Sequence, residues 1–389
     1  MDDFFGYQTG LFINKSTHTP APNFYSFSIS DNIYSAFPKL ILNFIDSTGL
    51  FLDLGNFTQG VPLNIKYGVS SINEILDVDF RSSSRDAVSP TTGAFGLNGV
   101  LNIKGLHESF FKNRKALHTS LKEMLVSDAV RKLFPAEGKL KVETTKGKIE
   151  SYAFEEPYIF TREVLLPQAT NGKIRPFVFF RNLLNELHFE SINLLENASP
   201  SEKLSFGDIE GENAHNTFYS FLPYNEGLNK TFIAFSAEGR MLKNDLNFEF
   251  DEKSVATDAK DKIPVIMDSR ICNDRYFHRQ FNPKVEYDQL NTAFFADAMK
   301  AGFFVDKAIG ILSFHPNLVA GKTVEIIVSV VDSERKTELS ETFSSNWLIE
   351  QSHHSWNGQL KRGQTQLVFC RSSMKPRRDS IIMDKAFKD

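Results

Sequence analysis

The last quarter of the chain, residues 308–371, constrains the fold more than any other stretch. Short apolar runs alternate with turn signals, and the longest run, residues 323–331, reads TVEIIVSVV. β-Branched residues are enriched in strands, and Asn357-Gly358 is a strong hairpin signal. The predicted strands cover residues 309–314, 323–331, a stretch ending at Phe343, 347–355 and 365–371. Five short strands joined by hairpins close most simply as a small barrel, which removes exposed edges.

A second β module is predicted near the N-terminus. Apolar runs at residues 40–45 and 50–54 flank a short polar turn, which is typical of a β-hairpin. Leu63, Ile65 and Tyr67 then alternate with polar residues, as in a half-buried strand. The preceding residues, 1–32, are rich in Ser, Thr, Asn and Pro, so we expect an extended arm there.

Between the two β modules, the hydrophobic period changes to that of a helix. Apolar residues recur at helical spacing at Leu117, Leu121, Leu125 and Leu133. Pro176 is suited to the first turn of another helix, since its missing N–H has no partner there. The predicted elements are a helix over residues 113–134, strands over 139–165, a helix over 176–187 and a helix over 285–301.

These patterns predict an α+β, mainly β fold with two small antiparallel β-barrel domains and helical and irregular insertions between them. The expected parts are an extended arm (1–32), a first β-barrel (33–110), an α+β middle domain (111–204), an irregular strand-rich insertion (205–284), a helix plus second β-barrel (285–371) and a basic tail (372–389). The tail carries Lys375, Arg377 and Arg378. It is interpreted either as an interaction arm or as a solvated tail.

Composition excludes several classes of protein. The formal net charge of −4 carries no nucleic-acid or membrane footprint at whole-chain level. Cys272 and Cys370 form no CxxC pair, which argues against a disulfide framework and a structural zinc site. No segment approaches 18 apolar residues and no signal-peptide core is visible, so we expect a soluble protein made inside the cell. The 37 Phe residues supply apolar area for the core or for partners, although a composition inherited from the source genome explains them equally well.

Residues 319–323 read VAGKT, which resembles the end of a nucleotide-binding P-loop. Two features of the sequence exclude this motif. A P-loop needs a Gly five residues before Gly321, where this chain has Pro316. It also needs a helix directly after the Lys-Thr pair, whereas the next residues are strongly strand-like.

Other candidate sites give way to simpler interpretations. Adjacent His353 and His354 point to opposite faces of a strand, so one buried and one exposed imidazole is favoured over a metal site. An acidic cluster could hold a hard cation, but it lacks the calcium-loop spacing and a solvated loop is favoured. This cluster comprises Asp208, Glu210, Glu212 and His215.

A basic and aromatic run at residues 275–279 could stack against a nucleic-acid strand, but a loop packed on a neighbouring segment is favoured. No GxSxG elbow and no protease-type Cys is present. The paired carboxylates of Glu155 and Glu156 have no context that would separate their pKa values. We therefore assign no catalytic, cofactor-binding or metal-binding residue, expect no cofactor, and predict that the chain is not an enzyme.

The C-terminal module resembles the closing barrel of the baseplate hub family of long-tailed phages, whose relatives include the base of type VI secretion spikes. The residues that carry the resemblance are Pro316-Asn317-Leu318, Gly321, Val324, Trp347-Leu348-Ile349, His353-His354 and the strand from Leu367 to Arg371. Nearer the N-terminus, Pro38, Leu40 to Phe44 and Gly60-Val61-Pro62-Leu63 are similar to the strands that open such hubs. The resemblance covers residues 33–190 loosely and 285–371 better, and residues 205–283 fit no pattern.

The resemblance implies a structural virion protein of the tail or baseplate, assembled in the host cytoplasm. It implies a homotrimeric ring with two barrels per chain that joins the tail tube to the central spike or tip, contacts surrounding baseplate proteins and lets DNA pass through its lumen. Two alternatives stay open. The chain could be a tail-tip receptor-binding adhesin that uses residues 205–283 for ligand contacts, or a tail-associated cell-wall hydrolase.

Overall fold

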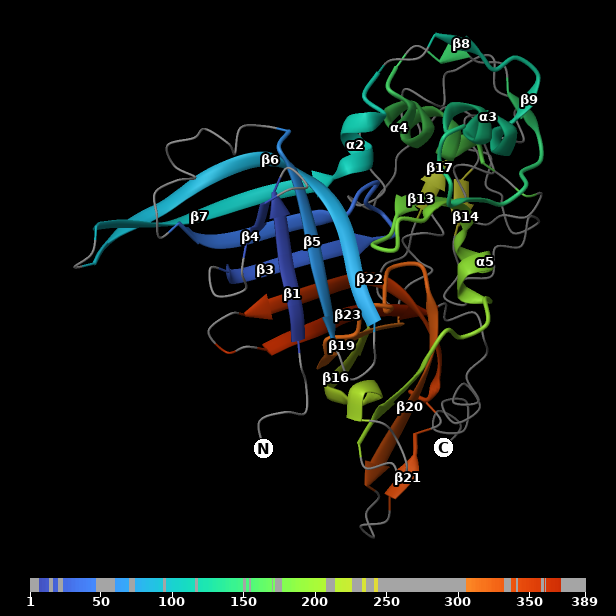
Figure 1. Cartoon of the computed structure of the whole chain (residues 1–389). Helices are drawn as coiled ribbons and strands as arrows, with labels where there is room; N and C mark the ends of the chain where they lie inside the picture. Colours follow the sequence, from blue (N-terminus) through green and yellow to red (C-terminus); the bar gives the residue numbers. More distant parts are fainter. Residues whose placement is uncertain are drawn as a thin grey trace.

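The computed structural model describes residues 7–13, 17–19, 24–46, 60–69, 74–93, 96–115, 118–149, 152–153, 155–169, 171, 177–207, 214–225, 233–235, 241–243, 306–331, 337–340, 342–357, 360 and 362–371. This part of the chain is mainly β, with mostly antiparallel pairing (Figure 1). Several predicted features lie outside the described residues: Cys272, the acids of the cluster at 208–212, the run at 275–279, the helix at 285–301 and the tail at 372–389.

One large sheet contains most of the strands, in the order β16-β19-β23-β22-β3-β4-β7-β6-β5-β1-β2. These strands are β1 (Tyr7–Ile13), β2 (Thr17–Thr19), β3 (Phe24–Asn32), β4 (Lys39–Asp46), β5 (Pro62–Val69), β6 (Glu74–Gly93), β7 (Gly96–His107), β16 (Phe218–Asn225), β19 (Asp306–Ser313), β22 (Ser345–Asn357) and β23 (Arg362–Arg371). Beside this path, β20 (Thr323–Val331) pairs with β22, β15 (Lys203–Phe206) and β21 (Thr337–Leu339). A separate short pair joins β17 (Ile233–Phe235) to β18 (Met241–Lys243).

The two β modules are joined edge to edge, and none of the described sheets closes into a barrel. The junction is the antiparallel pairing of β22 with β3, which aligns Trp356 with Phe27 and His354 with Ile29. In a closed barrel, every edge strand pairs with another strand of the same barrel. Here an edge strand of each module pairs with the other module instead. The expected pair of closed barrels is therefore not seen among the described residues.

Residues from both modules fill one hydrophobic core. Phe27 from β3 stacks on Trp356 from β22, with ring centroids 6.2 Å apart. The Tyr67 ring meets the Phe314 ring edge-on at 4.0 Å. Val319 belongs to the same buried cluster. The core of the N-terminal module is thus completed by side chains that lie more than half the chain away in sequence.

The first 32 residues contribute three strands, so the expected extended arm is wrong. β1 pairs with β5, and β3 lies between β22 and β4 inside the sheet. On β3, Phe27 and Ile29 are buried while Ser28 and Ser30 are only partly buried. The serines occupy the outer positions of a period-two pattern, which is why a polar composition concealed a core strand.

The alternation predicted for Leu63, Ile65 and Tyr67 is confirmed. Leu63, Ile65 and Tyr67 on β5 are buried, as is Ile103 on β7. The first arm of the predicted hairpin is β4. Its second arm, residues 50–54, lies outside the described residues.

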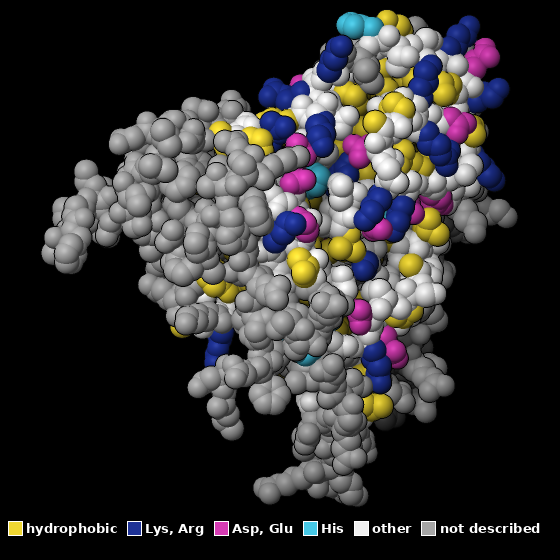
Figure 2. Space-filling view, viewed as in Figure 1, with side chains coloured by type: hydrophobic (Ala, Val, Ile, Leu, Met, Phe, Trp, Pro, Cys, Tyr) yellow, Lys and Arg dark blue, Asp and Glu magenta, His cyan; other side chains and the backbone are white. Residues whose placement is uncertain are grey.

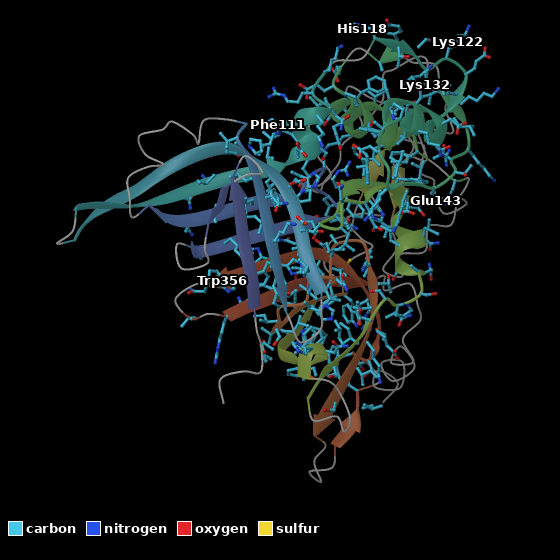
Figure 3. The ribbon with its side chains drawn as sticks, viewed as in Figure 1. Phe111, His118, Lys122, Lys132, Glu143 and Trp356 are labelled. Atoms are coloured by element: carbon cyan, nitrogen blue, oxygen red, sulfur yellow. The ribbon has the colours of Figure 1, made fainter. Side chains whose placement is uncertain are left out.

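The middle part of the chain forms a lobe beside the large sheet (Figure 1). Figure 3 labels Lys122, Lys132 and Glu143 on this lobe, well away from Trp356. Its first helical elements are α2 (Glu108–Lys112) and α3 (Val126–Leu133), and its short strand pairs are β8 (Thr119–Ser120) with β12 (Tyr152–Ala153), and β9 (Met124–Leu125) with β11 (Lys148–Ile149).

The predicted helix over residues 113–134 is therefore correct only at its C-terminal end. Glu123 has a φ of 57°, a left-handed conformation that an α-helix of L-residues does not continue through. Leu121 is buried as its pattern predicted, but it reaches the core from a turn. Leu121, Leu125 and Leu133 are spaced as in a helix, but they belong to separate elements of the structure.

The strands predicted over residues 139–165 are correct in the first half only. β10 (Leu140–Val142), β11 and β12 are strands, but α4 (Pro157–Phe160) and two further helical turns follow. These turns are a π-helical segment, η2 (Thr161–Leu165), and a 3₁₀ turn, η3 (Leu166–Gln168). Pro157 occupies the first turn of α4, where a proline's missing N–H costs nothing.

The helix predicted over residues 176–187 is a β-hairpin. β13 (Phe177–Arg181) pairs antiparallel with β14 (Leu187–Ser191), which also pairs with β10. All five residues of β13, including Arg181, are buried, so neither face is wet and no period-two signal exists. Asn185, at φ 62°, lies in the turn. A short helix, α5 (Ile192–Glu196), follows, and a 3₁₀ turn, η4 (Ala214–Asn216), precedes β16.

The C-terminal strands are confirmed. β19, β20, β21, β22 and β23 occur in the predicted order, and β20 has the predicted bounds. β22 is longer than predicted and carries a bulge near Ile349 in its pairing with β23. Trp347, Ile349, Leu367 and Phe369 are buried in a cluster together with Leu312 and Val324.

Candidate functional site

The turn before β20 excludes a nucleotide site. Gly321 has a φ of 86°, and β20 begins only two residues later, so no helix N-terminus faces this loop. A Cβ at position 321 would overlap the ring of Phe180 from β13. This glycine therefore provides a left-handed turn and a close approach between the middle lobe and the C-terminal module.

A buried carboxylate lies at the junction of the three parts of the chain. Asp31, on β3, accepts hydrogen bonds from the Ser352 hydroxyl at 2.5 Å, the Leu183 amide at 2.8 Å and the Ala320 amide at 3.1 Å. Burial raises its pKa to about 6, and the three donors oppose that rise. Asp31 thus ties both β modules to the hairpin of the middle lobe.

The network continues from Ser352 through the His354 imidazole and the Thr365 hydroxyl. Ser352 Oγ lies 3.2 Å from His354 Nε2, and His354 Nδ1 lies 2.9 Å from Thr365 Oγ1. The Thr365 hydroxyl accepts from the His315 amide at 2.9 Å. Burial, with smaller contributions from His353 and His315, lowers the pKa of His354 to about 3, so His354 is neutral near pH 7.

The predicted division of His353 and His354 between two faces is confirmed. His354 is fully buried, whereas His353 is half-buried and lies 3.3 Å from the Ser28 hydroxyl. His215 is also buried, but the acids predicted beside it lie outside the described residues. Within the described ranges, no group of three or more His, Cys, Asp or Glu residues could hold a metal ion.

Asp31, Ser352 and His354 match a hydrolytic triad in composition but not in geometry. In such triads the imidazole lies between the nucleophile and the acid. Here the serine lies between the carboxylate and the imidazole. All three side chains are at most 2% exposed. This set is a structural tie between strands.

Two residues that carry the sequence resemblance, Trp347 and Arg371, contact each other. The Arg371 guanidinium lies 4.4 Å from the centroid of the Trp347 ring, and it also donates to Asp306 and to Ser345. These contacts fix the end of β23 on β22 and β19. Cys370 beside it is a buried free thiol whose pKa is raised well above its usual value by burial.

Charges on the surface are mixed in sign. On the face in Figure 2, Lys and Arg side chains alternate with Asp and Glu over the described part of the middle lobe. No described helix is long and apolar enough to cross a membrane.

Two adjoining pockets were missed by the sequence patterns. They lie between the turn after β3 and the helical segment α4–η2, with volumes of about 390 and 730 Å³. Their linings share Ser35, Phe37, Lys39 and Arg162. These residues come from separate elements with no common motif, so no local signal could have identified the site.

Comparison with known proteins reveals likeness in structure but not in sequence. No known family profile matches the chain, and no curated protein matches it. A 43 kDa tail protein of prophage MuSo2 from Shewanella oneidensis superimposes with a TM-score of 0.57 at 10% identity, covering 95% of this chain and 99% of that one. The tail protein from Neisseria meningitidis MC58 gives a TM-score of 0.54 at 10% identity, covering 95% and 98%. The chain has the fold of phage tail proteins.

The same fold extends to a secretion system. The Escherichia coli c3393 protein superimposes with a TM-score of 0.50 at 10% identity, covering 94% of this chain and 80% of that one. That protein is described as a component of the type VI secretion system with structural similarity to the bacteriophage T4 tail proteins gp27 and gp5. The resemblance inferred from the last quarter of the sequence is thus matched by the fold of the whole chain.

Proposed function

We propose that this protein is a structural component of a phage virion, a tail or baseplate hub. The observation that carries the proposal is the likeness to phage tail proteins over nearly the full length of both chains. Because fold alone does not specify function, the proposal also rests on the architecture.

The hub forms a ring of three copies in this proposal. Each copy supplies two β modules as barrel-like wall units, so three copies give a pseudo-sixfold ring. Such a ring matches a sixfold tail tube on one side and a threefold spike or tip on the other. The edge-to-edge joining of β22 and β3 supports this, since it holds the two modules in one fixed arrangement.

The partners in this proposal are the tail tube protein, the spike or tip protein and the surrounding baseplate proteins, with DNA passing through the lumen. The hub is assembled in the host cytoplasm and resides in the virion tail. A net charge of −4 supports transit of DNA without adhesion, since like charges repel.

A non-enzymatic role fits the described chemistry. The Asp31–Ser352–His354 set is buried and in the wrong order for a nucleophile. Among the other groups with strongly shifted pKa values, His107 caps a helix, Glu186 pairs with a lysine, and His315 and Cys370 are shifted mainly by burial.

A mass measurement tests the proposal most directly. The purified full-length chain is expected to sediment as a trimer, and electron micrographs are expected to show rings that bind the ends of tail tubes. A strict monomer that degrades cell-wall material would contradict the hub and favour the hydrolase alternative. A protein that binds host cells but not tail tubes would favour the adhesin alternative.

A further inference from the structure

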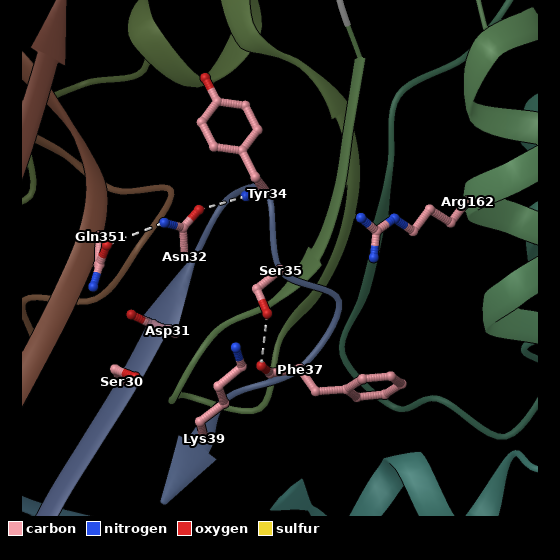
Figure 4. A pocket seen from close by; sticks show the side chains of 9 residues that line it. All are labelled: Ser30, Asp31, Asn32, Tyr34, Ser35, Phe37, Lys39, Arg162 and Gln351. Carbon is pink, nitrogen blue, oxygen red and sulfur yellow. Dashed lines mark hydrogen bonds between the residues drawn. The ribbon is translucent and has the colours of Figure 1, made fainter. Parts of the chain in front are cut away.

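The smaller of the two pockets is lined mainly by hydrogen-bond donors. Figure 4 shows Lys39 from β4 and Arg162 from η2 on two sides of Ser35, in the turn after β3. The pocket of about 390 Å³ is completed by Ser30, Asp31, Asn32, Tyr34, Phe37 and Gln351. It therefore draws on β3, β22 and the middle lobe together.

Both cations in this pocket lack a partner among the described residues. No ion pair or hydrogen bond involves the ammonium of Lys39 or the guanidinium of Arg162 within that part of the chain. The Gln351 amide accepts from Asn32 through its oxygen, which leaves its Nε2–H groups available. Arg offers a planar fork of donors that suits an oxyanion, and Lys adds a point charge.

Asp31, which contributes the single carboxylate of the pocket, does not cancel these cations. Both of its oxygens accept hydrogen bonds from inside the protein, one from Leu183 and the other from Ala320 and Ser352. The lining of the smaller pocket thus carries two cations against one internally satisfied carboxylate, whereas three glutamates line the larger pocket with the same two cations. The balance in the smaller pocket favours an anion over a cation.

The larger pocket continues from the smaller one and has a different character. Phe37, Phe110 and Ile159 supply apolar surface, and Glu155, Glu156 and Glu163 contribute to its lining. Ile159 is 47% exposed, so its side chain can be covered by a ligand. In a ligand larger than a simple anion, this apolar surface would bind an apolar group that lies next to the anionic group.

We propose that the Lys39–Arg162 pocket binds an oxyanion, either a carboxylate or a phosphate group. Two sources supply this chemistry: an acidic residue of a protein segment whose apolar neighbour enters the larger pocket, or a free phosphate ion. The site is independent of the hub assignment, because it requires neither a ring nor a tail tube.

Titration calorimetry of the full-length protein at low salt tests the site. The probes are sodium phosphate, sodium acetate and the two blocked dipeptides N-acetyl-Asp-Phe-amide and N-acetyl-Asn-Phe-amide. Phosphate is expected to bind, and the Asp dipeptide is expected to bind more tightly than the Asn dipeptide. The double variant Lys39→Gln/Arg162→Gln should weaken oxyanion binding by about a hundredfold, since each charge-assisted hydrogen bond contributes about tenfold or more.

The matched control is Lys115→Gln/Lys122→Gln, which removes the same charge from exposed positions of the middle lobe. It should leave binding unchanged, and circular dichroism should show both double variants folded. If a protein segment is the source, the Asp dipeptide binds more tightly than acetate and Ile159→Ser removes that gain. If free phosphate is the source, phosphate binds most tightly and Ile159→Ser has no effect.

Two results would overturn the proposal. One is the absence of measurable binding by phosphate and by both carboxylate probes. The other is equal weakening in the two double variants, which would show a general effect of net charge instead of a site.

Discussion

Asp31 accepts hydrogen bonds from three separate segments, and its burial makes the stability of the protein depend on pH. A raised pKa means that the folded state binds the proton more tightly than the unfolded chain does. The stabilising contribution is therefore complete below about pH 4 and is lost as pH rises through about 6. A shift of this size corresponds to about 3 kcal/mol.

Asp31→Asn should remove that pH dependence. Urea unfolding of the wild-type protein and of the variant should give free energies of unfolding whose difference changes by about 2 kcal/mol between pH 4 and pH 7. Asp128→Asn is the control, since Asp128 forms an exposed pair with Arg131. Parallel curves for wild type and Asp31→Asn would show that Asp31 does not titrate in this range.

Gly321 is the second residue on which the junction depends. Gly321→Ala should lower the free energy of unfolding by about 2–4 kcal/mol, because it adds left-handed strain and a clash with the Phe180 ring. Gly138→Ala should be nearly neutral, since a Cβ there meets nothing within 4 Å. Thermal melting of the two variants measures the contrast, and equal melting temperatures would refute this account of Gly321.

At the scale of elements, β22 serves both β modules. One of its edges pairs with β23, and the other pairs first with β20 and farther along with β3. Its burial alternates along the segment from Gln351 to Asn357, with Ser352, His354 and Trp356 pointing inward. This strand therefore couples the stability of the two modules.

Trp356→Ala tests that coupling. Removing the ring that contacts Phe27 and Tyr67 should cost about 3–5 kcal/mol and increase hydrogen exchange on β3 and β5 as well as on β22. Leu360→Ala, at a position that is 68% exposed, should change neither quantity. Faster exchange confined to β22 and β23 would mean that the modules open independently.

At the scale of the whole molecule, the shared core predicts that the N-terminal module does not fold alone. A fragment of residues 1–300 lacks Phe314, Val319 and Trp356, which complete that core. We expect it to show poor NMR dispersion and no cooperative unfolding, unlike the full chain. A fragment with a sharp unfolding transition would show that the first module is self-sufficient.

The amino-acid sequence determined most strands that have one buried and one wet face, with β3 as the exception. β5 and the strands after residue 306 show this alternation, because solvent on one face forces polar residues into every second position. The sequence also determined that Gly321 lies in a turn and not in a phosphate-binding loop. Turn chemistry and hydrophobic period are local properties, and local properties can be seen in a single chain.

Tertiary structure decided what local patterns do not encode. β13 is buried on both faces, so its FVFFR sequence suits a helix as well as a strand until β10 and β14 are beside it. The pairing of β22 with β3 and the convergence of Asp31, Leu183, Ala320 and Ser352 join residues up to 331 positions apart, the separation of Ser26 and Asn357. The pocket of Lys39, Arg162 and Gln351 has the same origin. Its residues share no spacing, because only the folding of the chain brings them together.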